Sequence, residues 1–166
     1  MSHRTADLHA SGLQIRNLRE LRHDPYAARK KLEEPTVCKG CGAIYHHGRW
    51  QWGMTPTNAK HALCPACQRI HDHCPAGFLH LSGAYLAAHK TDILQLVQHV
   101  IARENSEHPL KRMMTLEDRP DGGLDATFTD PHLARAIGEA IHDAHQGELA
   151  YAYQAGEFLL RVNWQR

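Results

Sequence analysis

Apolar residues in the second half of the chain recur with a helical period and then with a strand period. From Ala84 to about Asn105 they return every three or four positions, as on the buried face of a helix. This stripe consists of Leu86, Ile93, Leu94, Val97, Val100 and Ile101. Residues 112–117 and 124–129 then suggest two strands, with a turn at Pro120–Gly123 between them. The pattern predicts a helix followed by a strand pair.

A second helix and a second strand pair are expected before the end of the chain. Asp130-Pro131 is typical of a helix start, with aspartate as N-cap and proline in the first turn. One apolar face follows, made of Leu133, Ile137, Ala140, Ile141 and Ala144. Gly147 suits the end of this helix, and alternation predicts strands over 149–153 and 158–164. We therefore expect an α+β module over residues 81–166, in the order α-ββ-α-ββ.

The strongest motif is a pair of Cys-x-x-Cys sequences within residues 35–80, separated by 22 residues. The nearby glycines permit a tight turn that points two thiolates at one ion. Four thiolates complete a tetrahedron, whereas a catalytic zinc keeps one position open. We therefore predict a zinc ribbon over this range, with one structural Zn²⁺ per chain. Its ligands would be Cys38, Cys41, Cys64 and Cys67.

Four other residues that can bind metals lie close to the second pair. They are His61, His71, His73 and Cys74. Each could replace a cysteine ligand or form a second site, but two complete pairs already satisfy a tetrahedral ion. We interpret Cys74 as a small buried residue or a spare thiol.

A hairpin is expected between the two cysteine pairs, with strands over 43–46 and 49–52 and a turn at His47-Gly48. Trp50 and Trp52 would share one face, because side chains alternate along a strand. One interpretation is that they cover a ribbon with almost no other core. The other is a platform, centred on Trp50, on which unpaired RNA bases stack. Its neighbours would be His46, His47 and Arg49.

Residues 1–34 have the composition of a basic arm that is flexible when free. They hold seven Lys and Arg against five Asp and Glu, with few apolar residues. Arginine-rich segments of this kind order on RNA. The expected phosphate contacts come from Arg16, Arg19, Arg22, Arg29, Lys30 and Lys31.

The composition narrows the class of protein further. The chain has 166 residues and a net charge of +1, and no apolar run approaches the length of about 18 residues that a transmembrane helix needs. The start has no secretory signal, so we expect a cytoplasmic protein whose cysteines bind metal and form no disulfides. It has no Gly-rich phosphate loop, nucleophile elbow or H-E-x-x-H motif. We therefore expect neither an enzyme nor a small-molecule substrate.

Several segments together resemble a known group of proteins. They are Thr36–Gly42, Leu63–Cys67, His132–Ala140, Gln146–Leu149 and Leu159–Val162. Their order resembles a family of short, largely uncharacterised bacterial zinc-ribbon proteins, over roughly residues 22–166. Residues 126–163 and the ribbon are similar, more weakly, to archaeal and eukaryotic adaptors of large-ribosomal-subunit export. Those adaptors have more zinc pairs and a further C-terminal domain, so the resemblance implies ribosome or RNA binding but no export role.

Three hypotheses follow for the function. The first is a non-enzymatic protein that binds the ribosome or ribosomal RNA, as a stress, hibernation or subunit-maturation factor. The second is a module for protein–protein interaction, scaffolded by zinc. The third is a thiol redox sensor that releases zinc on oxidation, with Cys74 as the resolving thiol.

Overall fold

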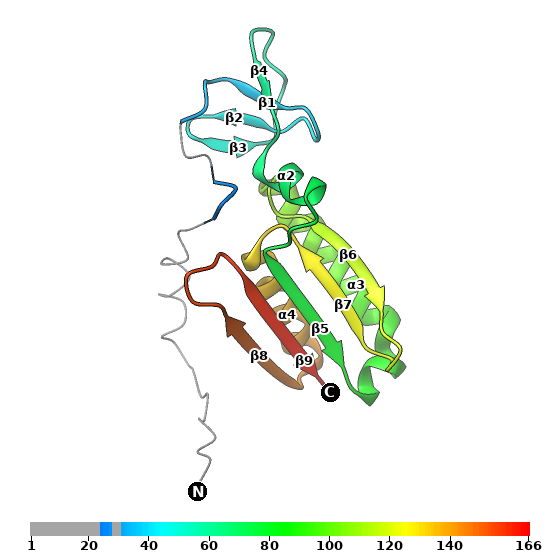
Figure 1. Ribbon diagram of the computed structural model, residues 1–166. Helices are drawn as coiled ribbons and strands as arrows, with labels where there is room; N and C mark the ends of the chain where they lie inside the picture. Colours follow the sequence, from blue (N-terminus) through cyan, green and yellow to red (C-terminus); the bar gives the residue numbers. More distant parts are fainter. Residues whose placement is uncertain (1–23, 28–30) are drawn as a thin grey trace, which may run out of the picture.

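The structure, a computed structural model, describes residues 24–27 and 31–166 and contains two separate β-sheets. A four-stranded sheet and a short helix contain the paired cysteines, and a five-stranded sheet with two longer helices follows in the chain (Figure 1). The predicted α+β class is therefore confirmed. The basic arm expected over residues 1–34 lies mostly outside the described residues, so its flexibility stays a prediction.

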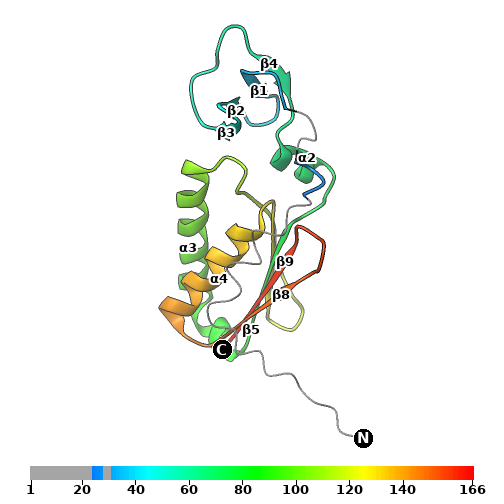
Figure 2. The same ribbon diagram turned by 90° about the vertical axis from the view of Figure 1, so that its left-hand side faces the viewer.

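The larger sheet is built from the second half of the chain. Its elements are β5 (Gly77–Ser82), α3 (Ala84–Glu107), β6 (Met113–Asp118), β7 (Leu124–Phe128), α4 (Pro131–His145), β8 (Glu148–Tyr153) and β9 (Leu160–Gln165). The strands lie in the order β6-β7-β5-β9-β8, with β5 and β9 parallel and the other neighbours antiparallel. Both helices cover the same face of the sheet (Figure 2). Within the described residues, no helix covers the other face.

The core of this unit lies between the sheet and its two helices. From the strands it takes alternate residues, including Leu79, Phe128, Val162 and Trp164. The helices contribute Leu86, Ile93, Val97 and Val100 from α3 and Leu133, Ile137 and Ile141 from α4. The predicted apolar stripes thus lie on the buried faces of both helices, except for Ala144 at the end of α4, which is exposed. In the described part of the chain, no helix has both the length and the apolar character needed to cross a bilayer.

Strand β5 corrects the predicted order of elements. The sequence pattern indicated α-ββ-α-ββ from residue 81 onward, but the sheet begins with Gly77–Ser82, which pairs with both β7 and β9. The predicted boundary between residues 80 and 81 therefore runs through a central strand. The sequence pattern did not indicate this strand, because its first inward position is a glycine and carries no apolar side chain. A Cβ at Gly77 would lie 2.9 Å from the Cβ of Ala134, so α4 packs directly against the strand backbone there.

We call residues 31–75 the cysteine module. Its elements are β1 (Thr36–Cys38), β2 (Ile44–His46), β3 (Arg49–Gln51), β4 (Lys60–Ala62) and α2 (Pro65–His71). The strands lie in the order β3-β2-β1-β4, and β1 pairs with β4 in parallel. The predicted hairpin is confirmed with shorter strands, and its turn has positive φ at His47 and Gly48. Beyond the predicted hairpin, the second cysteine pair opens a short helix.

Candidate metal centre

The first cysteine pair lies on a tight turn at the end of β1. The N–H of Cys38 donates to the carbonyl of Ala43 at 2.8 Å, and the N–H of Gly42 donates to the carbonyl of Cys38 at 2.9 Å. A Cβ at Gly40 would lie 2.6 Å from the sulfur of Cys67. Glycine at this position therefore lets the turn approach the second pair closely.

The second cysteine pair lies at the start of α2. Cys64 is the N-cap of this helix, and its sulfur accepts the N–H of Cys67 at 3.4 Å. Pro65 occupies the first turn, where its missing N–H costs nothing. The parallel pairing of β1 and β4 places Cys38 opposite Ala62, two residues before Cys64. Strand pairing between distant segments thus brings the two pairs together.

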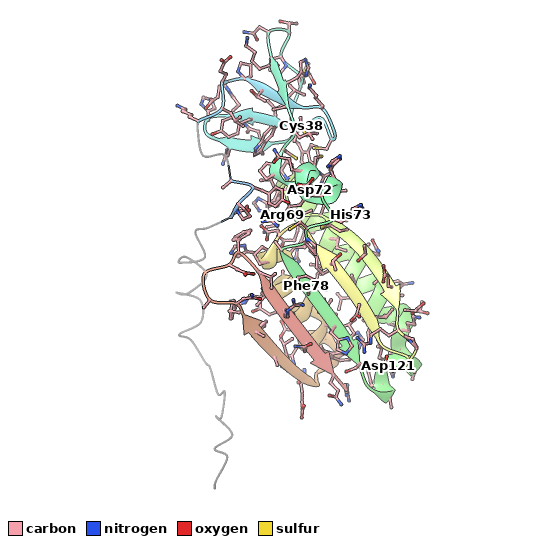
Figure 3. The ribbon with its side chains drawn as sticks, in the orientation of Figure 1. Cys38, Arg69, Asp72, His73, Phe78 and Asp121 are labelled. Carbon is pink, nitrogen blue, oxygen red and sulfur yellow. The ribbon has the colours of Figure 1, made fainter. Side chains whose placement is uncertain are left out.

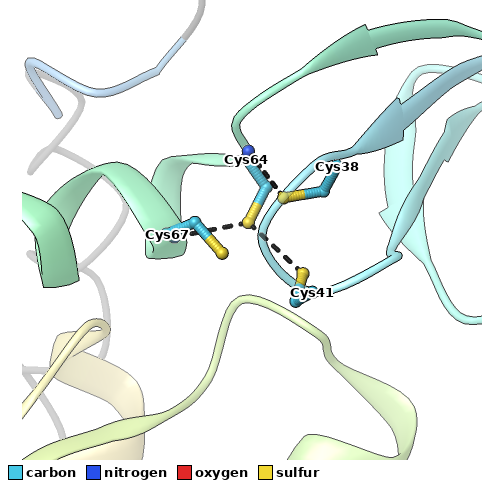
Figure 4. Close-up of side chains that lie close together, drawn as sticks. All are labelled: Cys38, Cys41, Cys64 and Cys67. Carbon is cyan, nitrogen blue, oxygen red and sulfur yellow. Dashed lines mark hydrogen bonds between the residues drawn. The ribbon is translucent and has the colours of Figure 1, made fainter.

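The four sulfur atoms meet between the turn and the helix, as Figure 4 shows. They all lie within 4.8 Å of one another, and those of Cys41 and Cys64 are 3.8 Å apart. Four sulfurs bound tetrahedrally at about 2.3 Å from a metal ion lie about 3.8 Å from each other. None of the five cysteines forms a disulfide. The cluster therefore fits one tetrahedral metal ion, with Cys38, Cys41, Cys64 and Cys67 as ligands.

The clustered thiols shift one another's pKa values. Burial and the neighbouring thiols raise the pKa values of Cys41 and Cys64 above their ordinary value. Burial also opposes the ionisation of Cys38, but backbone N–H groups that donate to its sulfur lower its pKa to about 6. The donors include Gly40 at 3.4 Å and Cys64 at 3.2 Å. A divalent cation removes the repulsion between the thiolates, so this donor set favours metal binding with release of protons.

A guanidinium group from the larger unit contacts the cluster. Arg112, which directly precedes β6, donates from Nη2 to the sulfur of Cys67 at 2.9 Å and lies 3.8 Å from that of Cys64. Burial alone would lower the pKa of Arg112, but the hydrogen bond to Cys67 and the nearby thiolates raise it, so the group stays cationic. Its main chain is fixed by Thr129, which accepts the Arg112 N–H at 2.9 Å. Four thiolates around a divalent ion carry a net charge of about −2, which this cation partly offsets.

Comparison of the chain with protein-family models, with curated proteins and with solved structures gave no match. The resemblance to bacterial zinc-ribbon proteins and to export adaptors therefore stays a prediction.

A second cation joins the cysteine module to its neighbours. Arg69 of α2 is 3% exposed and donates to a carboxylate oxygen of Asp24 at 2.5 Å. Its guanidinium carbon lies 4.4 Å from the ring centre of Tyr26 and 5.7 Å from that of Phe158 in the β8–β9 loop. Figure 3 shows Arg69 at the junction between the two sheets. The described part of the arm, residues 24–27, is therefore attached at this junction.

The residues predicted to contact RNA do not form one patch. His46, His47 and Arg49 are exposed on the β2–β3 hairpin, and Lys31 is exposed before β1. Trp50 is half-buried, packs against the cysteine cluster and lies opposite Tyr45, with ring centres 5.5 Å apart. Strand alternation puts it on the face opposite His46 and Arg49. The other predicted contacts lie outside the described residues: Arg16, Arg19, Arg22, Arg29 and Lys30.

The prediction that Trp50 and Trp52 share a face is wrong. Strand β3 ends at Gln51, so strand alternation does not extend to Trp52. The indole N–H of Trp52 donates to the carbonyl of Asn105 at 2.6 Å, and its ring borders a pocket that His46 also lines. Trp50 is therefore the tryptophan that covers the module.

The other candidate ligands lie apart from the cluster. Among the described residues, the four paired cysteines form the group that can hold a metal ion. The side chains outside it are exposed: His61, His71, His73 and Cys74. The interpretation of Cys74 as a buried residue is therefore wrong, and the interpretation as a spare thiol stays open.

Sequence reasoning missed Arg112, which contacts the cluster, and Arg69, which joins the module to its neighbours. Arg69 lies two residues after Cys67, so its closeness to the second cysteine pair was a signal that could have been used. Arg112 lies 45 residues after Cys67 and reaches the sulfur only through the packing of the two units. Its local sequence carries no sign of this contact.

Proposed function

We propose that the cysteine module holds one structural Zn²⁺ and that the protein binds the ribosome or ribosomal RNA without catalysing a reaction. Zinc is favoured because a tetrahedral set of four thiolates is its usual structural site. The residues that would hold it are the four cysteines of the cluster. A full set of four protein ligands leaves no position for a reactive water, which supports a structural role.

Arg112 should control how firmly the zinc is held. Replacing Arg112 by alanine removes a hydrogen bond to a bound thiolate and leaves the negative cluster without a neighbouring cation. We expect Arg112→Ala to lose zinc to a chelator about 10–100 times more readily, which is the range for loss of a hydrogen bond to a metal ligand. Arg112→Lys should lie between this variant and the unchanged protein. The measurement is the rate and extent of zinc transfer to a coloured chelator. Arg119→Ala, which removes an exposed arginine that binds Asp121 and Asp125, should behave like the unchanged protein.

The observation that carries RNA binding is the exposed basic hairpin of the cysteine module. His46, His47 and Arg49 lie at the tip of β2 and β3, and the two histidine rings are 3.9 Å apart. Arg49 lies on the face of the hairpin opposite the cysteine cluster, and the charge of that cluster is offset by Arg112. Arg49 therefore faces away from the metal site. The end of the basic arm, at Lys31, lies close to Glu34, and Glu34 accepts the N–H groups of His47 and Gly48 in the hairpin. The arm and the hairpin can therefore contact the same phosphate backbone.

Sedimentation of the zinc-loaded protein with ribosomes tests this function directly. We expect the protein to travel with ribosomal particles in a sucrose gradient at low salt and to leave them as salt is raised. Nuclease treatment should release it together with the RNA. A protein that stays at the top of the gradient at every salt concentration would contradict ribosome binding. A partner that resists both nuclease and salt would favour the protein–protein interaction module.

Charge reversal in the arm should weaken this association. Changing Arg29, Lys30 and Lys31 to glutamate removes three cations that we expect to contact phosphates. The slope of log affinity against log salt should become shallower by about 2–3, because fewer counterions are released on binding when phosphate contacts are lost. The measurement is a binding titration at four or more salt concentrations. Arg103→Glu, at an exposed position on α3, is the matched control, and an unchanged slope in the arm variant would place the contacts elsewhere.

A further inference from the structure

The outer face of the small sheet carries a pocket that the predicted RNA contacts do not explain. Its volume is about 470 Å³, within the range of about 300–1,000 Å³ typical of ligand sites. Its lining includes Pro35, Ile44, His46, Gln51, Trp52 and Met54. This face is the one opposite Trp50 and the cysteine cluster. The pocket is therefore separate from the metal centre.

Trp52 is held rigidly at one side of this pocket. Its indole N–H donates to the carbonyl of Asn105 at 2.6 Å, and the Asn105 amide in turn donates to the carbonyl of Lys111 at 3.2 Å. The residue nevertheless remains 39% exposed. An aromatic ring with a fixed orientation and a free surface loses little entropy when a flat ligand stacks on it.

The other residues of the pocket add a flexible apolar rim and polar groups. Met54 is 93% exposed and lines the pocket together with Trp52. The Gln51 amide uses one of its two N–H groups on the carbonyl of His46, at 3.1 Å. The remaining amide groups of Gln51 suit the edge of a nucleobase, which both donates and accepts hydrogen bonds.

An arginine on the same face of the sheet as the pocket suits an anionic ligand. Arg49 pairs with His46 across the hairpin, so both side chains lie on the same face of the sheet as the pocket. Glu34 accepts the N–H groups of His47 and Gly48 at 2.7 and 3.1 Å and also lies 3.6 Å from the ring Nδ1 of His46, so Arg49 is the cation of this hairpin on which a phosphate would lie. A ligand with an apolar flat part and a phosphate is therefore better matched to this surface than an uncharged apolar peptide.

We propose that this pocket binds an unpaired nucleobase, stacked on Trp52, with the adjoining phosphate on Arg49. The proposal rests on the RNA-binding function above and specifies its substrate as single-stranded RNA. Duplex bases stay stacked inside the helix and cannot enter such a pocket. Trp52 thereby takes the stacking role that the sequence had suggested for Trp50.

The test compares Trp52→Ala, Trp52→Phe and Trp50→Phe in binding to a single-stranded RNA oligonucleotide and to a duplex of the same sequence. We expect Trp52→Ala to weaken single-strand binding about 5- to 150-fold, the loss that corresponds to one base–aromatic stack. Trp52→Phe should retain most of the affinity, and binding to the duplex should change little. Zinc content and the circular dichroism spectrum show whether each variant is folded.

Tryptophan fluorescence gives a second measurement. In the Trp50→Phe variant the remaining emission comes from Trp52 and the buried Trp164, so quenching by single-stranded RNA reports on Trp52. Folded Trp52→Ala that binds single strands as tightly as the unchanged protein would overturn the pocket but leave RNA binding intact. An unchanged protein that binds neither ribosomes nor RNA would overturn both. Binding of an apolar peptide with no binding of RNA would assign the pocket to a protein partner and contradict the proposal.

Discussion

Replacing Cys64 by serine is expected to abolish zinc binding and unfold the cysteine module while the larger sheet stays folded. Cys64 is fully buried, supplies one of the four sulfurs and caps the first turn of α2. Serine is a far weaker zinc ligand, and structural zinc sites contribute about 10–16 kcal/mol of apparent binding free energy to folding. Metal analysis of the purified variant should fall from one zinc per chain to almost none.

The dependence on metal follows from the size of the two cores. The buried cluster of the cysteine module consists of Cys38, Ala43, Cys64 and Ala66, so two of its four members are metal ligands. A module with so little apolar surface to bury cannot offset the entropy of ordering its chain without the metal. The larger sheet has its own cluster of sixteen buried residues, none of which is a cysteine. Its stability should therefore not require the metal.

Cys74→Ser is the matched control for this experiment. Cys74 is exposed and lies outside the cluster, so its replacement should leave both zinc content and folding unchanged. Nuclear magnetic resonance spectra should show dispersed signals for the larger sheet in the Cys64→Ser variant. Full zinc content in this variant would show that another ligand, such as His61 or His71, can take the place of Cys64. Collapse of all signals would show that the two units fold only together.

The metal ligands could be predicted from the sequence because their geometry is mostly local. Two residues between the cysteines of a pair bring both sulfurs to one side, on a glycine-containing turn in the first pair and at the start of a helix in the second. The Asp130 cap of α4 was predictable for the same reason, and its carboxylate accepts the N–H groups of His132 and Leu133. The cysteine spacing and the cap are each contained in a few consecutive residues, whereas the approach of the two cysteine pairs rests on the pairing of β1 with β4.

The features that were missed depend on contacts between distant segments. The role of β5 rests on pairing with β7 and β9, which lie roughly 45 and 80 residues later in the chain. Arg112 reaches Cys67 because the α3–β6 connection packs beside α2. Trp52 leaves the expected face because β3 ends one residue early and a carbonyl of α3 accepts its N–H. Periodicity within a single segment cannot report any of these contacts.

The position of β5 also determines which fragment can fold alone. A fragment that starts at residue 81 lacks most of a central strand and leaves β7 and β9 without their shared neighbour. A fragment that starts at residue 76 keeps the strand and the N–H of Ala76, which donates to the carbonyl of Phe128 at 2.9 Å. Studies of the larger sheet in isolation should therefore begin there.

Trp164→Ala is the reciprocal experiment, in which we expect the larger sheet to lose stability and the cysteine module to keep its zinc. Trp164 is fully buried on β9, opposite Leu149 on β8 and Leu81 on β5. Its indole N–H donates to the carbonyl of Gln146 at 2.7 Å, which fixes the end of α4. Truncation of a buried aromatic side chain costs about 3–5 kcal/mol, a large part of the 5–15 kcal/mol by which an ordinary domain is stable.

Urea unfolding followed by circular dichroism measures this loss, and zinc release measured in the same samples shows whether the module responds. Trp164→Phe keeps most of the apolar contact but loses the hydrogen bond, so it should lie closer to the unchanged protein. If zinc is released only at higher urea than the sheet transition, the two units are separate folding units despite the contact between Arg112 and Cys67. Zinc release that follows the sheet transition in every variant would instead mean that the contacts between the units couple them into one cooperative unit. These contacts include Arg112 with Cys67, Trp52 with Asn105 and Arg69 with Phe158.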